Sequence, residues 1–352
     1  MHSMIGPLLG RGKMAPHANQ EGRLHMKLKL NPFPLIFEQG DTATKLWCLE
    51  CLGLADSRWA HEWLLELIRA QRADGTFPSA LDARQWGMRE TVRNTLLLLV
   101  MGLSAEGANV AAAVRFVLEH PLAEGGWCEN PGLDIPPFQQ TFLSGRRGVT
   151  WLTADAVELL RQVGLGEGEV CQAAISWLRA QQNAWGGWPS VPPDEDEELP
   201  NRGDPDAMAQ VTFLLGALFG VDDPQYRSGR ELYEDFLNET AADAERGYRI
   251  RESDGSREDV EVYGLTHLLL SWLGDRPRRI HAGYDIHDRR VQSLMKALLA
   301  CQADDGGWRP FWSDESSPLY AALAAKTLGL TGVVPMQDVR DMALGVLSGS
   351  IG

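Results

Sequence analysis

Long hydrophobic runs are absent from this sequence of 352 residues. The most apolar stretch, residues 95–103, is about half as long as the ~20 residues that a helix needs to cross a bilayer. Residues 1–25 contain Gly, Pro, His and Arg and lack the uninterrupted apolar stretch of a secretory signal. We therefore expect a disordered leader over residues 1–25 and no membrane span, which leaves only contact with a membrane surface open.

Positively charged residues are fewer than negatively charged ones. The chain has 33 Lys and Arg against 48 Asp and Glu, which gives a formal net charge of -15. Such a surface repels phosphate backbones, so nucleic acid is not an expected partner. Hydrophobic residues make up 44% and charged residues 23% of the chain, which is typical of a folded protein with a large core.

Cysteine is also scarce, with five in the chain. None has zinc-ligand spacing apart from the pair Cys48 and Cys51, which lies in an apolar run where positions three apart share one helix face. We interpret that pair as core packing rather than a redox site. Free thiols fit a reducing compartment, so we expect the protein to be cytoplasmic.

One phrase recurs along the chain: an amphipathic helix, a Gln, a few polar residues, then Gly and an aromatic residue. Clear copies run through residues 71–77, 182–188 and 302–308. Degenerate copies with the aromatic but without the Gln occur at residues 125–127 and 247–248. The repeat length is roughly 50–60 residues, which indicates a repeated helical unit.

Each repeat contains two helical stretches. The predicted pairs are 42–53 with 57–71, 90–103 with 107–119, 150–163 with 167–181, 205–219 with 226–240, 258–273 with 288–302, and 317–329 with 335–348. We predict an all-α fold in which six pairs form a closed α/α toroid, a single domain over residues 26–352. An open solenoid is the alternative, and the lack of polar capping repeats favours closure. The long connections between pairs are expected at one mouth of the barrel, where we look for function.

The recurrent phrase resembles a known motif. Gln-x-x-x-Gly-x-Trp, present at residues 182–188 and 302–308, is similar to the QW motif of squalene and oxidosqualene cyclases, whose superfamily includes the β subunits of protein prenyltransferases. The resemblance extends from about Asn31 to the C-terminus. It implies an α/α toroid in which the Gln and the aromatic tie an outer helix to the start of the next inner helix, a structural role.

A second resemblance concerns an acid. Asp204-Pro205-Asp206 is similar to the Asp-x-Asp-Asp-Thr-Ala signature of class II terpenoid cyclases, and Ala207 and Met208 depart from it. The resemblance implies that Asp206, with Asp204 beside it, protonates an alkene, which requires a carboxyl kept neutral by burial. The alternative is that Asp204 caps a helix and Asp206 interacts with the helix dipole.

Protein prenyltransferase β subunits, in which one barrel holds the isoprenoid, are the better geometric model, because the second helical domain of class II cyclases has no counterpart here. Their zinc site would need an Asp-x-Cys and a His. The corresponding positions, residues 259–261 and 318–321, contain neither Cys nor His. No zinc and no zinc-dependent thiol alkylation are therefore expected.

The substrate-binding candidates are aromatic and basic residues near the expected inner-helix starts. The aromatic candidates are Trp86, Trp151, Tyr263, Trp312 and Tyr320, and the basic ones are Arg249, Arg251 and Arg257. Aromatic faces could meet a polyene or a carbocation, and arginines a diphosphate, although core packing and solvated loop charges are the alternatives. No cofactor is expected, except Mg²⁺ on the acidic residues 194–198 if the substrate is a diphosphate.

Three functions remain open from the sequence: a terpenoid cyclase-like enzyme that cyclises an isoprenoid by acid initiation, a zinc-independent transferase that uses a prenyl diphosphate, and a toroid that binds an isoprenoid or a partner without catalysis.

Overall fold

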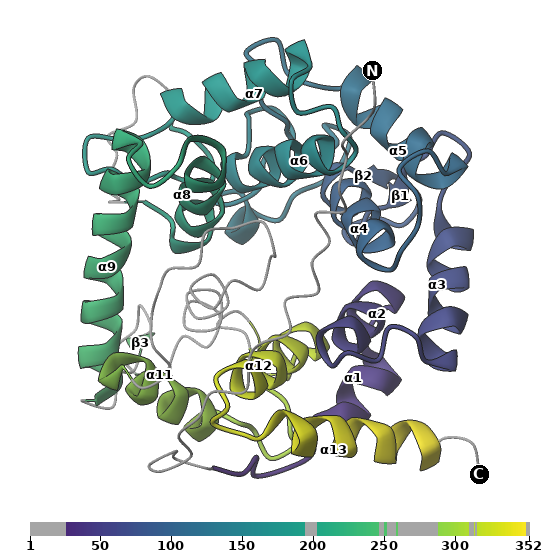
Figure 1. The fold of residues 1–352 in the computed structure, drawn as a ribbon, viewed down its shortest axis with the longest axis vertical. Helices are drawn as coiled ribbons and strands as arrows, with labels where there is room; N and C mark the ends of the chain where they lie inside the picture. Colours follow the sequence, from purple (N-terminus) through teal and green to yellow (C-terminus); the bar gives the residue numbers. More distant parts are fainter. Residues whose placement is uncertain are drawn as a thin grey trace, which may run out of the picture.

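The computed structural model describes residues 26–193, 203–245, 250–251, 258–259, 288–309, 313 and 315–349. The described helices form two concentric layers around one axis (Figure 1). The inner layer consists of α2 (Thr42–Cys51), α4 (Met88–Val100), α6 (Thr150–Gln162), α8 (Pro205–Phe219) and α12 (Pro318–Leu330). The outer layer consists of α3 (Arg58–Ala70), α5 (Ala108–Glu119), α7 (Glu169–Ala180), α9 (Pro224–Glu245), α11 (Arg289–Ala300) and α13 (Met336–Gly349).

Smaller elements complete the fold. A short helix, α1 (Phe33–Gln39), packs on α12 and α13. A 3-10 turn, η1 (Pro137–Gln139), lies in the connection between α5 and α6. Two antiparallel hairpins pair β1 (Phe77–Pro78) with β2 (Trp86–Gly87), and β3 (Ile250–Arg251) with β4 (Glu258–Asp259). The first hairpin leads directly into α4.

The ring closes on itself. Helices α2, α4, α6 and α8 contact one another in that order, α8 packs on α9, and α9 packs on α11. The Thr331 hydroxyl, just after α12, lies 3.3 Å from Met295 Sδ of α11, and α12 packs on α2. The predicted all-α toroid is therefore confirmed and the open solenoid is wrong.

Local sequence explains where several helices begin. The Asp41 carboxylate accepts the N–H of Thr44 at 2.7 Å, and the Ser57 hydroxyl accepts the N–H of Ala60 at 3.2 Å, so each caps the helix that follows. Residues 150–160 of α6 are all buried, as expected of an inner helix covered on most sides. The outer helix α3 instead buries Ala60 and Leu67 on one side and exposes the other.

The tryptophans of the recurrent phrase join three parts of each repeat. Trp127, Trp188 and Trp308 are fully buried, and their indole N–H groups donate to carbonyls of the preceding outer helix at 2.9, 2.7 and 2.8 Å. Their own carbonyls accept N–H groups of the residues just before the next inner helices, Val149, Asp204 and Ser317, at 2.8, 2.9 and 2.9 Å. Because this contact recurs, these inner helices begin at the same end of the ring.

The glutamines of the phrase make a different link from the expected one. Gln71 and Gln182 donate to the carbonyl of the phrase glycine at 2.9 and 2.8 Å. They also donate to a carbonyl at the start of the next outer helix, Asn109 at 2.9 Å and Gln225 at 3.0 Å. The Gln therefore ties outer helix to outer helix, and these helices follow the perimeter with the end of one beside the start of the next (Figure 1).

Some boundaries differ from the sequence predictions. Helix α1 was not expected, and α9 continues to Glu245. Residues 258–259, predicted to open a helix, form β4 instead, and the rest of that predicted helix lies outside the described residues, as does the leader 1–25. None of the helices in the described part of the chain is both long enough and apolar enough to span a lipid bilayer.

Candidate functional site

Two threonines mark the outward face of the inner helices α4 and α6. The Thr91 hydroxyl accepts the N–H of Phe77 at 3.1 Å, and the Thr153 hydroxyl accepts the N–H of Trp127 at 3.0 Å. Phe77 and Trp127 belong to the turns that follow outer helices, so these threonines point away from the ring axis. The opposite face of each helix is therefore the face turned toward the axis.

Two arginines lie on the axis-side face of α4. This face carries Arg89, Arg93, Leu96 and Val100, whose spacing of four, three and four residues places them on one side of a helix. All four are partly or fully exposed, whereas the outward face that contains Thr91 is buried. Helix α4 therefore presents cationic side chains followed by apolar ones toward the axis.

An ion pair and a stacked ring join α4 to α6. The Arg93 Nε lies 3.2 Å from Asp155 Oδ2, and the guanidinium carbon lies 4.6 Å from the ring centroid of Trp151. The Asp155 side chain is completely buried, whereas the Arg93 side chain is 40% exposed. Trp151, predicted to meet substrate, is itself buried, with its indole N–H donated to the Phe142 carbonyl at 2.8 Å and one ring face covered by Arg93.

The predicted acid, Asp206, has a defined place in the repeat. The N–H of Val149 donates to the Trp127 carbonyl, and Trp151 follows two residues later. In the next repeat, the N–H of Asp204 donates to the Trp188 carbonyl, and Asp206 follows two residues later. Asp206 therefore holds the position in α8 that Trp151 holds in α6, on the face turned toward the axis. The side chain of Asp206 lies outside the described part of the structure.

Three apolar residues near the start of α8 are buried. Ala207, Met208 and Ala209 are at most 1% exposed. Asp204, half-buried, precedes the helix, and its carbonyl accepts the N–H of Met208 at 2.8 Å.

The remaining predicted aromatic residues fall in different surroundings. Trp86, in β2, makes an edge contact with Phe116 of α5 at 5.0 Å and a tilted contact with His120, which directly follows α5, at 6.0 Å. Its ring therefore packs toward the outer layer. Tyr320, in the first turn of α12, is buried, with 3% of its surface exposed.

Several predicted site residues lie outside the described residues. They are Tyr263, Trp312, Arg249, Arg257 and the side chain of Arg251, whose backbone forms part of β3, together with the acidic residues 194–198 considered for Mg²⁺. Within the described ranges, no group of three or more His, Cys, Asp and Glu side chains is arranged to hold a metal ion.

A buried glutamate at the start of α4 was not predicted. Glu129 is 1% exposed, and its carboxylate accepts the backbone N–H groups of Met88 at 2.5 Å, Arg89 at 3.2 Å and Asn130 at 2.8 Å. Burial and the nearby charge of Glu90 raise its pKa, and these hydrogen bonds oppose that shift. No spacing in the sequence relates Glu129 to α4, 40 residues away from Arg89 along the chain.

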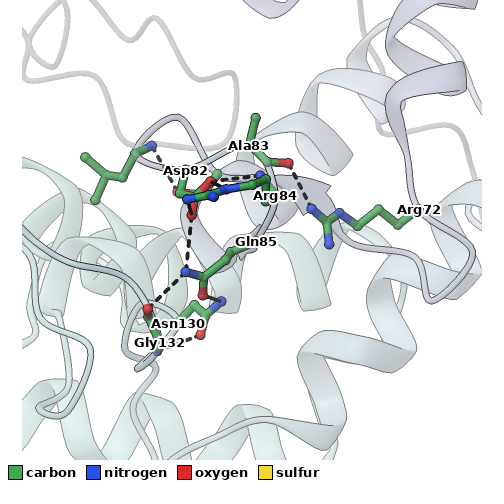
Figure 2. A network of polar contacts seen from close by, with 9 residues as sticks. Arg72, Asp82, Ala83, Arg84, Gln85, Asn130 and Gly132 are labelled. Atoms are coloured by element: carbon green, nitrogen blue, oxygen red, sulfur yellow. Dashed lines mark hydrogen bonds and ion pairs between the residues drawn. The ribbon is translucent and has the colours of Figure 1, made fainter.

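Side chains also join the connection that carries this glutamate to the connection before α4. The Gln85 amide donates to the Gly132 carbonyl at 3.1 Å (Figure 2). The Asn130 amide donates to the Trp86 carbonyl at 2.9 Å. These bonds link the α3–α4 connection to the α5–α6 connection at the end of the ring where the inner helices begin. Glu129 is thereby held against the first turn of α4.

Charged side chains stiffen the same α3–α4 connection. Asp82 accepts two bonds from the guanidinium of Arg84, at 2.9 and 3.0 Å, and Arg72 donates to the Ala83 carbonyl at 3.0 Å (Figure 2). The side-chain bond from Arg84 lowers the pKa of Asp82 well below its usual value. This pair is exposed to solvent, so its role is to shape the loop rather than to stabilise the fold.

Solved structures share this architecture. A protein from Actinoplanes matches with a TM-score of 0.55 at 14% identity, over 83% of this chain and 90% of that one. A variant of the type II terpene cyclase MstE from Scytonema, in complex with its substrate geranylgeranyl dihydroxybenzoate, matches with a TM-score of 0.53 at 16% identity, over 84% of this chain and 87% of that one. No protein-family model matches the sequence, and no curated protein matches it. The chain therefore has the fold of type II terpene cyclases, and these identities establish the fold alone.

Proposed function

We propose that this protein is a class II terpene cyclase-like enzyme that cyclises an isoprenoid by protonating one of its double bonds, with Asp206 as the acid. The observation that carries the proposal is the register of Asp206 in α8, which matches that of Trp151 in α6, with the buried Ala207, Met208 and Ala209 directly after it. The shared fold supports it, because MstE is a cyclase that takes a geranylgeranyl substrate.

The reaction begins with proton transfer from the Asp206 carboxyl to an alkene carbon. The two π electrons form the new C–H bond and leave a tertiary carbocation, which the next double bond attacks to close a ring. Loss of a proton from the last cation ends the sequence and balances the first step. The acid must be neutral when substrate binds, and the buried Ala207, Met208 and Ala209 favour the neutral form.

Asp204 completes the acid site in this proposal. Its carboxylate, two residues before Asp206, disfavours a second negative charge nearby and so favours a proton on Asp206. Two further acids, Asp155 and Glu158, lie on the axis-side face of α6, and both are at most 5% exposed. Asp155 pairs with Arg93 at 3.2 Å and Glu158 lies 3.8 Å from Arg161 Nη1, so neither acid places an uncompensated negative charge beside the path of the cation.

A non-catalytic, isoprenoid-binding toroid is the second candidate, and one observation favours it. Ala207 and Met208 are fully buried where the cyclase signature has Asp and Thr, so the acid lacks the polar neighbours that the resemblance implies. The zinc-independent prenyl transferase would depend on Arg249, Arg251 and Arg257, whose side chains lie outside the described residues.

The test is product formation from linear isoprenoids. Purified protein is incubated with squalene, geranylgeraniol and geranylgeranyl diphosphate in D₂O, and the products are separated by mass. A cyclic product with one deuterium on the protonated carbon is expected from the parent. Asp206→Asn should fold and bind normally and turn over at least about a hundredfold more slowly.

Asp338→Asn is the matched control, because Asp338 lies in the first turn of an outer helix, α13, and is exposed. It should keep full turnover. Full activity in Asp206→Asn, or a cyclic product without deuterium, rules out this acid. Binding of an isoprenoid without any product selects the binding toroid instead.

A further inference from the structure

We propose that Arg93 binds an oxyanion at the end of the isoprenoid ligand, a carboxylate or a diphosphate. This inference rests on the proposed function and adds the head group to it. Its basis is the placement of the Arg93 guanidinium on the axis-side face of α4. Asp155 and the Trp151 ring contact this group, and 40% of the side chain remains exposed.

The guanidinium is held in one orientation. Its Nε lies 3.2 Å from Asp155 Oδ2, and its plane lies over the Trp151 ring at 4.6 Å. Asp155 is completely buried and cannot move into solvent, and Trp151 is anchored by its bond to the Phe142 carbonyl. A guanidinium fixed in this way loses little conformational entropy when it binds an anion.

The terminal nitrogens of Arg93 are available. A guanidinium has five N–H donors, and Asp155 accepts the one on Nε. Within the described part of the chain, the terminal nitrogens have no hydrogen-bond acceptor, and the side chain is 40% exposed. Two parallel N–H groups of this kind match the oxygens of a carboxylate or a phosphate, and a neutral alcohol offers no such pair.

The positions of Arg93 and Asp206 set a requirement on the ligand. Arg93 lies on α4 and Asp206 on α8, with α6 between them. Two neighbouring helix spacings amount to roughly 15–20 Å. A ligand that places its anion at Arg93 and its terminal double bond at Asp206 must cover that span, which favours a long polyprenyl chain over one of one or two isoprene units.

The outer layer contains a matched comparison. Arg179 lies 4.7 Å from the Phe219 ring and 2.9 Å from an oxygen of Asp223, so it is also stacked and paired. Its side chain is 33% exposed, close to the value for Arg93. Arg179 ends α7 on the perimeter, away from the axis-side face, so the two arginines differ mainly in location.

The experiment measures binding, not turnover, by titration calorimetry with geranylgeranyl diphosphate, geranylgeranoic acid and geranylgeraniol. Arg93→Gln is combined with Asp155→Asn, because removal of Arg93 alone would take the ion-pair partner at 3.2 Å away from a completely buried carboxylate. The double variant should bind at least one of the two anions about tenfold more weakly, the loss expected of a charge-assisted hydrogen bond, and bind the alcohol within about twofold of the parent. Arg179→Gln with Asp223→Asn should bind all three ligands as the parent does.

Arg93→Lys provides a second variant should the double variant fail to fold. It keeps the charge but loses the planar fork, and weaker binding of the affected anion is expected, without change for the alcohol. The anion that loses affinity identifies the head group as carboxylate or diphosphate. Unchanged anion binding, an equal loss for the alcohol, or a parent that binds neither anion overturns the proposal. Asp206→Asn should keep the same order of affinities, so a failure of acid-initiated cyclisation is visible separately, in turnover.

Discussion

Truncation of Trp188 tests whether the recurrent phrase holds the ring together. The indole is fully buried, and its N–H donates to the Leu178 carbonyl at 2.7 Å. Trp188→Ala removes a large core side chain and should lower the free energy of unfolding by about 3–5 kcal/mol. For a chain of 352 residues, the entropy of unfolding is about 0.7 kcal/mol/K, so the melting temperature should fall by about 4–7 °C.

Trp188→Phe separates packing from hydrogen bonding. The ring is largely kept, and the N–H donor is lost. The Leu178 carbonyl still accepts the N–H of Gln181 at 3.2 Å, so it is not left without a partner. The cost should therefore stay near ~1 kcal/mol, about 1–2 °C in melting temperature.

Differential scanning calorimetry provides the measurement, and Trp185 provides the control. Trp185 lies three residues earlier in the same turn and is 63% exposed, so Trp185→Ala should leave the melting temperature within about 1 °C of the parent. Equal melting temperatures for Trp188→Ala and the parent would refute the structural role assigned to the phrase. So would a loss in Trp185→Ala as large as that in Trp188→Ala.

Two further predictions concern a turn and a buried acid. Gly75 has φ +90°, and an added Cβ would lie 2.3 Å from the Ala112 carbonyl carbon, so Gly75→Ala should destabilise by more than ~2 kcal/mol. Gly102 has φ +94° with open space around it, so Gly102→Ala should cost only the ~1 kcal/mol of backbone strain; equal losses in chemical denaturation would contradict the clash. For Glu129, the folded protein raises the pKa above the ordinary value of 4.5, so the folded state binds this proton more tightly than the unfolded state. Stability from this group is present below pH 4.5 and is lost as the pH rises through the folded pKa, whereas Glu129→Gln has no such loss. The free energy of unfolding of the parent minus that of Glu129→Gln should therefore fall from pH 4 to pH 7. A rise of this quantity with pH would show that the pKa of Glu129 is lowered instead.

The repeat pattern predicted the ring because it depends on local chemistry. Inner and outer helices show the apolar spacing that their burial requires, and five of the six predicted pairs correspond to described helix pairs. The missed helix α1 follows Pro32 and contains Pro34. Proline is compatible with the first turn of a helix, so the pattern there was ambiguous.

The site was less accessible to sequence reasoning, because it depends on register between repeats. Arg93 and Asp155 are 62 residues apart, and their pairing follows only once α4 and α6 are aligned through Thr91 and Thr153. The connections before the inner helices differ in length, so the sequence offers no constant spacing for such an alignment. The link from Gln71 to Asn109 was missed for a similar reason, since it requires knowing that outer helices follow one another along the perimeter.

The last repeat completes its glutamine link with the beginning of the chain. Gln302 donates to the Leu30 carbonyl at 2.9 Å and accepts the N–H of Lys29 at 2.8 Å, across more than 270 residues of sequence. Contacts of such high sequence separation form late, because the loop-closure entropy must be overcome first. During synthesis, the backbone at Leu30 has no glutamine to pair with until residue 302 has been made. The segment before the first helix pair therefore stays unpaired until the repeat that contains Gln302 has folded, and its exposed edge is open to misassembly until then.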